Sequence, residues 1–345
     1  MGFYFCGTAD NYSQKDGLGN GFHKGSGIKI LDPFSPMERI LLKKPDTSYI
    51  IKKKPFEDVK MGQISLNAYA KINLSIDIVR KREDGYHDVK MIMQTVDLCD
   101  KITLTDKDDG GVKIICDKPY IPTGSTNTAY KAADLFLKEY GVKKGVCIKI
   151  EKNIPTASGL AGGSADAAAV LRGMGELFSV DADEGELMEI GKKIGADVPF
   201  CIKGGTMLAE GIGDLLTKIN PFSGVDIVLV KPRISVSTAW VYQNLNLHRA
   251  IKRPNTRLLV EAISNGDRVC VAQNMKNVLE SVTIGKYRVI NEIKSTLMEF
   301  GAQGSMMSGS GPCVFGIFED RQKAEYAFQK IKGGYWDCYL ARTLC

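Results

Sequence analysis

Alternating apolar and polar residues predict a long β-strand soon after residue 60. In residues 66–78, isoleucine and leucine occupy every second position from 72 onward, so they share one face of an extended chain. Lys71 and Asn73 belong to the opposite, polar face, which either meets solvent or lines a ligand cleft. The strand is therefore predicted to be half-buried, and its polar face is a first candidate for chemistry.

The same kind of pattern predicts a mixed α and β chain. Further strands are expected at residues 91–104, 112–116, 146–150, 206–210 and 226–230. Helices are expected at residues 126–140, 184–194, 275–279 and 289–300, and after the loops at 155–163 and 234–237. A turn at Asn220-Pro221 marks the expected boundary between two domains.

The most informative segment joins a strand to a helix. Residues 154–171 run from a Gly- and Ser-rich loop directly into an Ala-rich helix. Glycines let the backbone approach a ligand, and the free N–H groups at a helix start favour an anion such as a polyphosphate. Ser164 can offer a hydroxyl there, and Asp166 can cap the first turn. The loop is neither a Walker loop nor a dinucleotide fingerprint, and an ordinary turn before a tightly packed helix stays open.

Two other turns carry candidate residues. Asp197 follows a predicted helix and precedes Val198-Pro199; because a residue before proline disfavours the helical region, we expect Val198 outside a helix. Asp197 is then either a structural turn residue or a positioned general base. A second Gly- and Ser-rich loop, residues 304–312, precedes a buried strand. It supports bound phosphates or a neighbouring loop, unless it is a simple hairpin-like turn.

Composition narrows the class of protein. The chain has 345 residues, of which 44% are hydrophobic and 25% charged, as in an ordinary globular protein of two domains. Its net charge of +6 divides equally between residues 1–60 and the rest, so the main body is nearly balanced. A nucleic-acid partner is not expected, because such proteins usually carry a strong basic patch.

Several other classes are disfavoured. The nine cysteines form no Cys-x-x-Cys pair and the three histidines are far apart, so neither a zinc site nor a disulfide framework is expected. No apolar run is long enough to span a membrane, and no segment reads as a signal peptide, so we expect a cytoplasmic protein without membrane contact. Residues 1–60 are expected to be a poorly ordered extension, or alternatively a targeting or docking arm.

Five segments, taken in order, resemble a known family. Residues 70–74, 155–166 and 308–312 resemble the three motifs of the GHMP small-molecule kinases. Residues 84–87 and 195–200 resemble the members that phosphorylate a cytidyl-diphosphate sugar alcohol in the non-mevalonate isoprenoid pathway. The resemblance implies an α+β fold of two domains, at 61–222 and 223–345. The first would bind ATP and contain a left-handed βαβ unit, and the second would be an α/β sandwich.

The resemblance also implies residue roles. Lys71 and Asp197 match the catalytic pair: Asp197 would accept the proton of the alcohol, and Lys71 would keep that carboxylate ionised and stabilise negative charge. ATP with Mg²⁺ would be the donor, although the resemblance assigns no protein ligand to the metal. The residues matched to ATP binding are Asn127, Lys152, Pro155, Thr156, Ala157, Ser158, Gly159, Leu160, Ala161, Gly162, Gly163 and Ser164. The residues matched to the substrate are Tyr86, His87 and Tyr242 at the cytosine, and Asn73 and Thr238 at the sugar-alcohol end.

Two alternatives remain open. One is another GHMP kinase, acting on homoserine, mevalonate or a sugar; the aromatic residues that would read a base argue against it. The other is a non-catalytic nucleotide- or RNA-binding protein, which would have no use for both Lys71 and Asp197. The expected partner is a small-molecule substrate, and the expected state is a monomer or homodimer.

Overall fold

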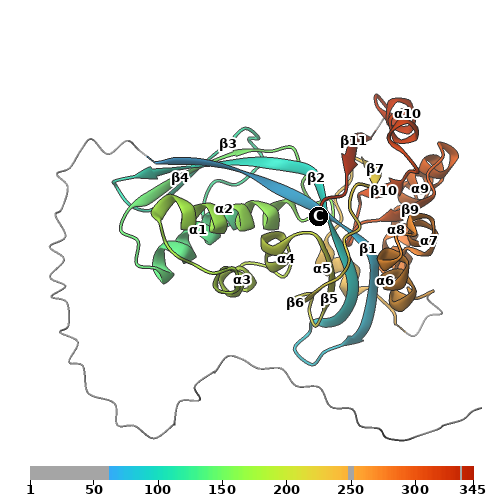
Figure 1. Cartoon of the computed structure of the whole chain (residues 1–345), viewed down its shortest axis with the longest axis horizontal. Helices are drawn as coiled ribbons and strands as arrows, with labels where there is room; N and C mark the ends of the chain where they lie inside the picture. The colour runs from blue at the N-terminus through green and yellow to red at the C-terminus, as the bar shows by residue number, and fades with distance from the viewer. Residues whose placement is uncertain (1–61, 248–251, 335) are drawn as a thin grey trace, which may run out of the picture. The chain divides into compact units, whose positions relative to one another are not determined.

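Two β-sheets organise the part of the chain that the computed structural model describes, which is residues 62–247, 252–334 and 336–345 (Figure 1). The larger sheet contains β1 (Gln63–Lys81), β2 (His87–Lys107), β3 (Val112–Cys116), β4 (Gly145–Glu151), β5 (Thr206–Glu210), β6 (Leu215–Lys218) and β8 (Lys276–Asn277). The smaller sheet contains β7 (Asp226–Lys231), β9 (Gly304–Met307), β10 (Val314–Ile317) and β11 (Asp337–Arg342). The predicted extension, residues 1–60, lies outside the described residues.

Helices flank both sheets. They are α1 (Thr128–Glu139), α2 (Gly162–Phe178), α3 (Glu184–Lys192), α4 (Val198–Lys203), α5 (Thr238–Gln243), α6 (Thr256–Ser264), α7 (Arg268–Asn274), α8 (Glu280–Lys286), α9 (Val289–Glu299) and α10 (Arg321–Ile331). Figure 1 shows α1 and α2 along one face of the larger sheet. A parallel β3–α1–β4 connection forms a βαβ unit in that sheet. None of the helices in the described ranges is long and apolar enough to cross a membrane.

A long antiparallel pair, β1 with β2, forms the centre of the larger sheet. Its register shifts between Tyr69 and Lys71 and again between Asn73 and Ser75, so the ladder is irregular around the two candidate polar residues. The backbone N–H of Lys71 instead donates to the carbonyl of Leu160. The expectation of a strand at 66–78 is confirmed. Its polar face is exposed at Asn67 and partly exposed at Asp77, but Lys71, Asn73 and Ser75 between them are buried.

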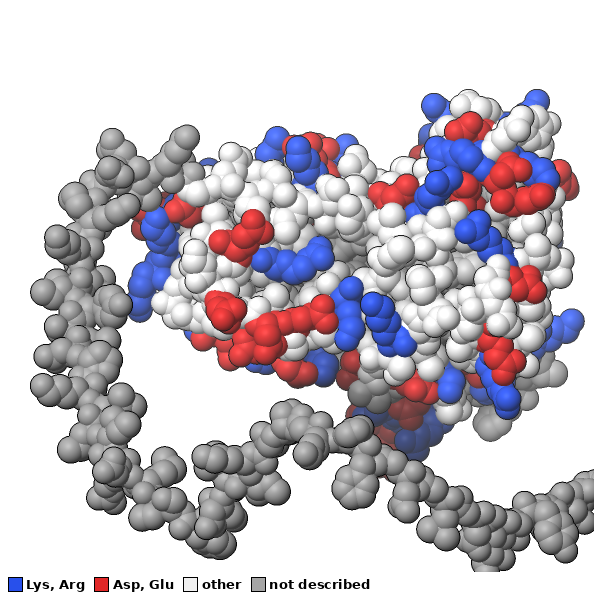
Figure 2. Space-filling view, in the orientation of Figure 1, with Lys and Arg blue, Asp and Glu red and all other residues white. Residues whose placement is uncertain are grey.

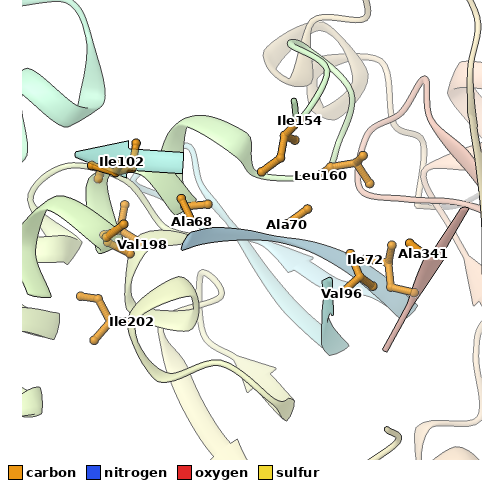
Figure 3. Packing of buried hydrophobic residues seen from close by; sticks show 14 of the residues in the cluster. Ala68, Ala70, Ile72, Val96, Ile102, Ile154, Leu160, Val198, Ile202 and Ala341 are labelled. Atoms are coloured by element: carbon orange, nitrogen blue, oxygen red, sulfur yellow. The ribbon is translucent and has the colours of Figure 1, made fainter. Parts of the chain in front are cut away.

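Two clusters of buried hydrophobic residues form the core, and the larger one contains residues of both sheets. Figure 3 shows Ile72 of β1 near Val96 of β2 and Ala341 of β11, and all three belong to one cluster of buried residues. Helix α2 is buried on most of its surface from Ala165 to Leu171, which explains why its sequence is small and apolar instead of amphipathic. The loop that precedes α2 is thus anchored on a rigid base.

Some predicted elements are wrong in instructive ways. Residues 275–279 were expected to be helical, but Lys276–Asn277 forms β8. This short strand pairs in parallel with the edge of β1, whose backbone N–H and carbonyl groups need hydrogen-bond partners. Val198 was expected outside a helix, but it begins α4, because Pro199 lies in the first turn, where no intrahelical N–H bond is lost. Part of the predicted loop at 304–312 is β9, which pairs with β10. Several short elements, such as β6 and α6, had no prediction.

The predicted domain boundary lies in the connection between β6 and β7. Every strand of the smaller sheet follows it, whereas β8 returns to the larger sheet. The chain also returns at its end, where the N–H of Leu344 donates to the carbonyl of Thr95 in β2. The exact division at residue 222 stays a prediction.

Candidate active site

A cavity of about 900 Å³ lies between the loop that precedes α2, the tip of the β1–β2 hairpin and the start of α5. Every residue predicted for the site, except Leu160, contributes to its lining. Leu160 is fully buried in the core, close to Ile154 (Figure 3). The structure therefore gathers residues that are far apart in the sequence around a single space, although their individual roles stay predictions.

Lys71 lies at the centre of the cavity wall. Its ammonium donates to Oδ1 of Asn73 at 2.8 Å and lies 3.6 Å from Oδ2 of Asp197. The Lys71 side chain is 5% exposed, whereas Asp197 is 32% exposed. Oδ1 of Asn73 also accepts from the N–H of Gly309 at 3.1 Å, which fixes the amide. Asn73 therefore holds the Lys71 ammonium in place, close to the carboxylate of Asp197.

Asp197 owes its availability to the way α4 begins. It occupies the N-cap position, yet its side chain makes no capping hydrogen bond. An aspartate at this position usually caps the helix, so its carboxylate has been left for other contacts. The Asp197 carboxylate is thus free to face the cavity, and its catalytic role stays a prediction.

The glycine-rich loop rests on the second Gly- and Ser-rich loop. Oγ of Ser308 donates to the carbonyl of Gly159 at 3.1 Å, and the N–H of Cys313 donates to the carbonyl of Ser158 at 3.1 Å. Gly159 has φ +81°, and a Cβ there would lie 2.1 Å from the carbonyl oxygen of Ser308. The second loop therefore supports the glycine-rich loop, which is one of the two functions expected for it from the sequence.

The start of α2 has unused hydrogen-bond donors. Ala161 precedes the helix in a left-handed conformation, and within the described ranges no side chain caps the first turn. The prediction that Asp166 caps this turn is wrong, because its carboxylate points to Lys152 instead. Thr128, at the start of α1, donates to the carbonyl of Gly163 at 2.6 Å and ties the two helix starts together. The N–H groups of the first turn belong to Gly162, Gly163 and Ser164, which line the cavity.

A buried charge cluster lies beneath the loop. The ammonium of Lys152 donates to Asp166 at 2.7 Å and also binds Asp100, and all three side chains are at most 6% exposed. Burial, with the nearby charge of Asp100, raises the pKa of Asp166 to about 7 although Lys152 acts in the opposite direction. Burial also disfavours charged Lys152, but the two carboxylates outweigh it and raise its pKa. Sequence reasoning missed Asp100 and this use of Lys152 and Asp166.

Aromatic side chains gather at the other end of the cavity. The rings of His87 and Tyr242 lie 5.2 Å apart and are tilted by 48°. Tyr86 is 62% exposed, so one face of its ring is free to stack. Burial, with the charge of Lys81, lowers the pKa of His87, and burial raises the pKa of Tyr242 to about 12. Both side chains are accordingly neutral at pH 7.

Two further predicted residues, Thr238 and Asn127, have structural partners. Oγ1 of Thr238 lies 2.8 Å from Oγ of Ser310, which joins α5 to the second loop. Asn127 caps α1 by accepting from the N–H of Ala129 and donates to the carbonyl of Pro122. A further residue missed in the sequence, Asn277, donates to the carbonyls of Met307 and Gly309, both at 2.8 Å. Its neighbours in the sequence, Lys276 and Val278, gave no signal of this role.

Comparison with known proteins agrees with this geometry. Residues 127–205 match the model of the GHMP kinases N terminal domain, and residues 259–335 match that of the GHMP kinases C terminal domain. The curated 4-diphosphocytidyl-2-C-methyl-D-erythritol kinase of Acetivibrio thermocellus is 60% identical over 284 residues, which are 82% of this chain and all of the relative. The protein of the same name from Clostridium botulinum strain Eklund 17B is 50% identical over 281 residues, 81% of this chain and all of the relative.

Solved structures agree as well. A crystal structure of 4-(cytidine 5'-diphospho)-2C-methyl-D-erythritol kinase has a TM-score of 0.71 and 29% identity, and the match covers 81% of this chain and 99% of that one. Homoserine kinase from Cytophaga hutchinsonii has a TM-score of 0.67 at 20% identity, covers 84% of this chain and 98% of its own, and shares the fold. The two-domain fold that the motifs implied is thereby confirmed. The chain belongs to the GHMP kinases and, within them, to the family of the 4-diphosphocytidyl-2-C-methyl-D-erythritol kinases.

Proposed function

We propose that the chain transfers the γ-phosphoryl group of ATP to the 2-hydroxyl of 4-diphosphocytidyl-2-C-methyl-D-erythritol, a step of the non-mevalonate isoprenoid pathway. The relative from Acetivibrio thermocellus, 60% identical, carries the name of that kinase. The observation that carries the proposal is the Lys71–Asp197 pair, 3.6 Å apart on the wall of a cavity that has a phosphate-type loop and an aromatic end.

The pair fits the requirements of phosphoryl transfer to an alcohol. The hydroxyl must lose its proton as its oxygen bonds to the phosphorus, and Asp197 is the exposed carboxylate that can accept this proton. Lys71 is fixed by Asn73, so its ammonium stays close to Asp197 and to the site of transfer. The same ammonium stabilises the negative charge of the transferring group.

The loop at 155–164 supplies the phosphate site. It ends in the uncapped start of α2, whose N–H groups and dipole favour the charged oxygens of a nucleotide. Its residues are small, so a phosphate chain can approach the backbone closely. Its position is fixed by the bonds from Ser308 and Cys313, which gives the bound phosphates a rigid support.

The aromatic end suits a cytosine base. Tyr86 and Tyr242 provide rings for stacking, and neutral His87 offers one donor and one acceptor to the edge of the base. A homoserine or mevalonate substrate would leave these groups without a function. On the face shown in Figure 2, basic and acidic side chains are interspersed, and no broad basic stripe of the kind that binds RNA appears there.

Magnesium is the proposed metal, and the lining of the cavity is compatible with it. Mg²⁺ at nucleotide sites is usually held by one or two carboxylates together with phosphates and water. Among the described residues, the carboxylates in the lining are Asp166 and Asp197. Bound with ATP, the metal would neutralise phosphate charge; the protein would contribute the loop N–H groups, Lys71 and one of these carboxylates.

An ADP-release assay on the full chain tests the proposal. The cytidyl substrate, mevalonate and homoserine are offered in parallel, each with ATP and Mg²⁺. We expect turnover with the cytidyl substrate and none with the other two. Turnover with mevalonate or homoserine instead would support another kinase of the superfamily, and RNA binding by a protein that does not bind ATP would overturn the kinase assignment.

A further inference from the structure

One oxygen of Asp166 is buried without a partner. Its Oδ2 accepts from Lys152 at 2.7 Å, whereas Oδ1 has no hydrogen bond within the described residues. The side chain is 6% exposed and belongs to the lining of the cavity. An unpaired carboxylate oxygen in such a place is costly, so a ligand that supplies positive charge or a donor is expected to fill it.

The surrounding residues hold this carboxylate in one position. Lys152 is itself bound by Asp100, whose Oδ1 accepts from the N–H groups of Asn153 and Ile154 at 2.6 and 2.8 Å. Gly162, the first residue of α2, packs against this group, and a Cβ there would lie 3.2 Å from the Lys152 ammonium. The loop, the lysine and the two acids thus form one rigid unit in which Oδ1 of Asp166 is already oriented.

The charge of this unit indicates which kind of ligand it takes. One ammonium faces two carboxylates, so when both Asp100 and Asp166 are ionised one negative charge is uncompensated, and a bound cation would favour that state. Asp166 is in the fifth position of α2, directly below the uncapped N–H groups that would bind phosphates. A negative charge so close to phosphates would repel them unless a cation lay between the two.

We propose that Oδ1 of Asp166 binds the divalent cation that accompanies the nucleotide, either directly or through one water of its hydration shell. This inference rests on the ATP dependence in the proposed function. Both acids of the lining are paired with a lysine, but Asp166 keeps Oδ1 without a partner within the described residues, whereas Asp197 is the carboxylate assigned to the hydroxyl proton. Lys152 and Asp100 are positioning residues that hold it.

Metal binding in the presence of ADP tests the proposal without any acceptor substrate. Mn²⁺ replaces Mg²⁺, and its free concentration is followed by electron paramagnetic resonance in titrations of the full chain with ADP. We expect Asp166→Asn to weaken Mn²⁺ binding in the ADP complex at least about tenfold. Affinity for metal-free ADP should stay unchanged. Asp134→Asn, which removes an exposed carboxylate from α1, is the matched control and should change neither quantity.

The outcomes separate the rival explanations. Unchanged Mn²⁺ affinity in Asp166→Asn, with a loss in Asp197→Asn, would overturn the proposal. An equal loss of metal-free ADP affinity would show that Oδ1 serves a donor group of the nucleotide instead. If the chain binds Mn²⁺–ADP through Asp166 but phosphorylates no cytidyl substrate, the proposed function fails and this inference stands.

Iron-dependent cleavage of the backbone tests the proposal on the unmodified protein, so the result does not depend on whether a variant folds. Fe²⁺ replaces the metal in the ADP complex, and ascorbate with hydrogen peroxide produces radicals that cleave the backbone close to the iron. We expect ADP-dependent cleavage in the first turns of α2, around residues 162–166. Cleavage confined to the segment around Asp197 would overturn the proposal.

Discussion

The ammonium of Lys71 lies 3.6 Å from Oδ2 of Asp197, although the two residues are brought together from the middle of β1 and the start of α4. The lysine is buried and held by Asn73, whereas the aspartate is partly exposed to the cavity. The less mobile partner is therefore the cation, and the carboxylate keeps a free side for a substrate hydroxyl. This asymmetry is what a general base requires, because it must hold its charge and still contact the proton it removes.

Replacing the carboxylate by an amide tests that role. Asp197→Asn keeps the shape of the side chain but removes the proton acceptor, so we expect kcat to fall about 10²–10⁴-fold. Affinity for ATP should change little, since the loop and α2 are untouched. Steady-state kinetics and ADP titration measure the two effects. Glu189→Gln on α3 is the control, because Glu189 is exposed and pairs with Lys192. Full turnover by Asp197→Asn would exclude the residue from the chemistry.

Loss of a stacking ring should affect one substrate and not the other. Tyr86 is 62% exposed, so Tyr86→Ala removes a ring from the cavity without opening the core. Stacking on a base is worth about 1–3 kcal/mol, so the Kd for the cytidyl substrate should rise about 5- to 150-fold. The Kd for ATP should not change. Tyr326→Ala, at an exposed tyrosine on α10 outside the cavity, serves as the comparison and should leave both values unchanged. Equal weakening of both ligands would contradict the assigned base site.

Local patterns in the sequence were sufficient for the elements that carry the site. Alternation found β1 because successive side chains of a strand point to opposite faces. The run of glycine and other small residues found the loop because its backbone turns through left-handed positions, among them Gly159 at φ +81°. Alternation could not show that Lys71 and Asn73, on the polar face of β1, are buried. Burial of these residues depends on which distant segment packs over them. For Asn73 that segment is the loop that contains Gly309, whose N–H donates to the Asn73 side chain.

Contacts between distant residues were beyond prediction. Lys152 meets Asp100 across 52 residues of sequence and Asp166 across 14, and nothing in the separate segments pairs them. Asp166 was assigned to the helix cap because aspartate is common at helix starts; the buried ammonium competes more strongly for the carboxylate than a solvent-facing N–H group does. Similarly, β8 exists only because β1 presents an edge to residues Lys276 and Asn277.

Acid should weaken binding of the cytidyl substrate. Burial and the charge of Lys81 lower the pKa of His87 below the usual 6.5, so the ring is neutral at pH 7 and gains a proton only at lower pH. The charged ring loses its acceptor and adds repulsion towards Lys81. We therefore expect the Kd to be constant from about pH 7 to 9 and to rise as pH falls through the lowered pKa. Calorimetry without ATP measures it, and His87→Gln should remove the pH dependence. A Kd that stays constant down to pH 5 would argue against contact between His87 and the substrate.

Alanine substitutions at two glycines should distinguish the effect of the contact between the two loops from the effect of backbone strain alone. Gly159 has φ +81°, and a Cβ there would lie 2.1 Å from the carbonyl oxygen of Ser308. In Gly141, φ is +62° and no atom would lie within 4 Å of an added Cβ. Gly141→Ala should therefore lower the free energy of unfolding by about 1 kcal/mol and leave ATP binding unchanged.

Gly159→Ala introduces the same backbone strain, and in addition its Cβ would push the loop around Gly159 away from Ser308. We expect it to lower the free energy of unfolding by more than the roughly 1–3 kcal/mol of a strained backbone alone. It should also weaken ATP binding, because the loop can relieve the clash only by moving away from Ser308. Urea denaturation and ATP titration of both variants measure these effects. If Gly159→Ala matched Gly141→Ala in both, contact between the two loops would not be what fixes the nucleotide site.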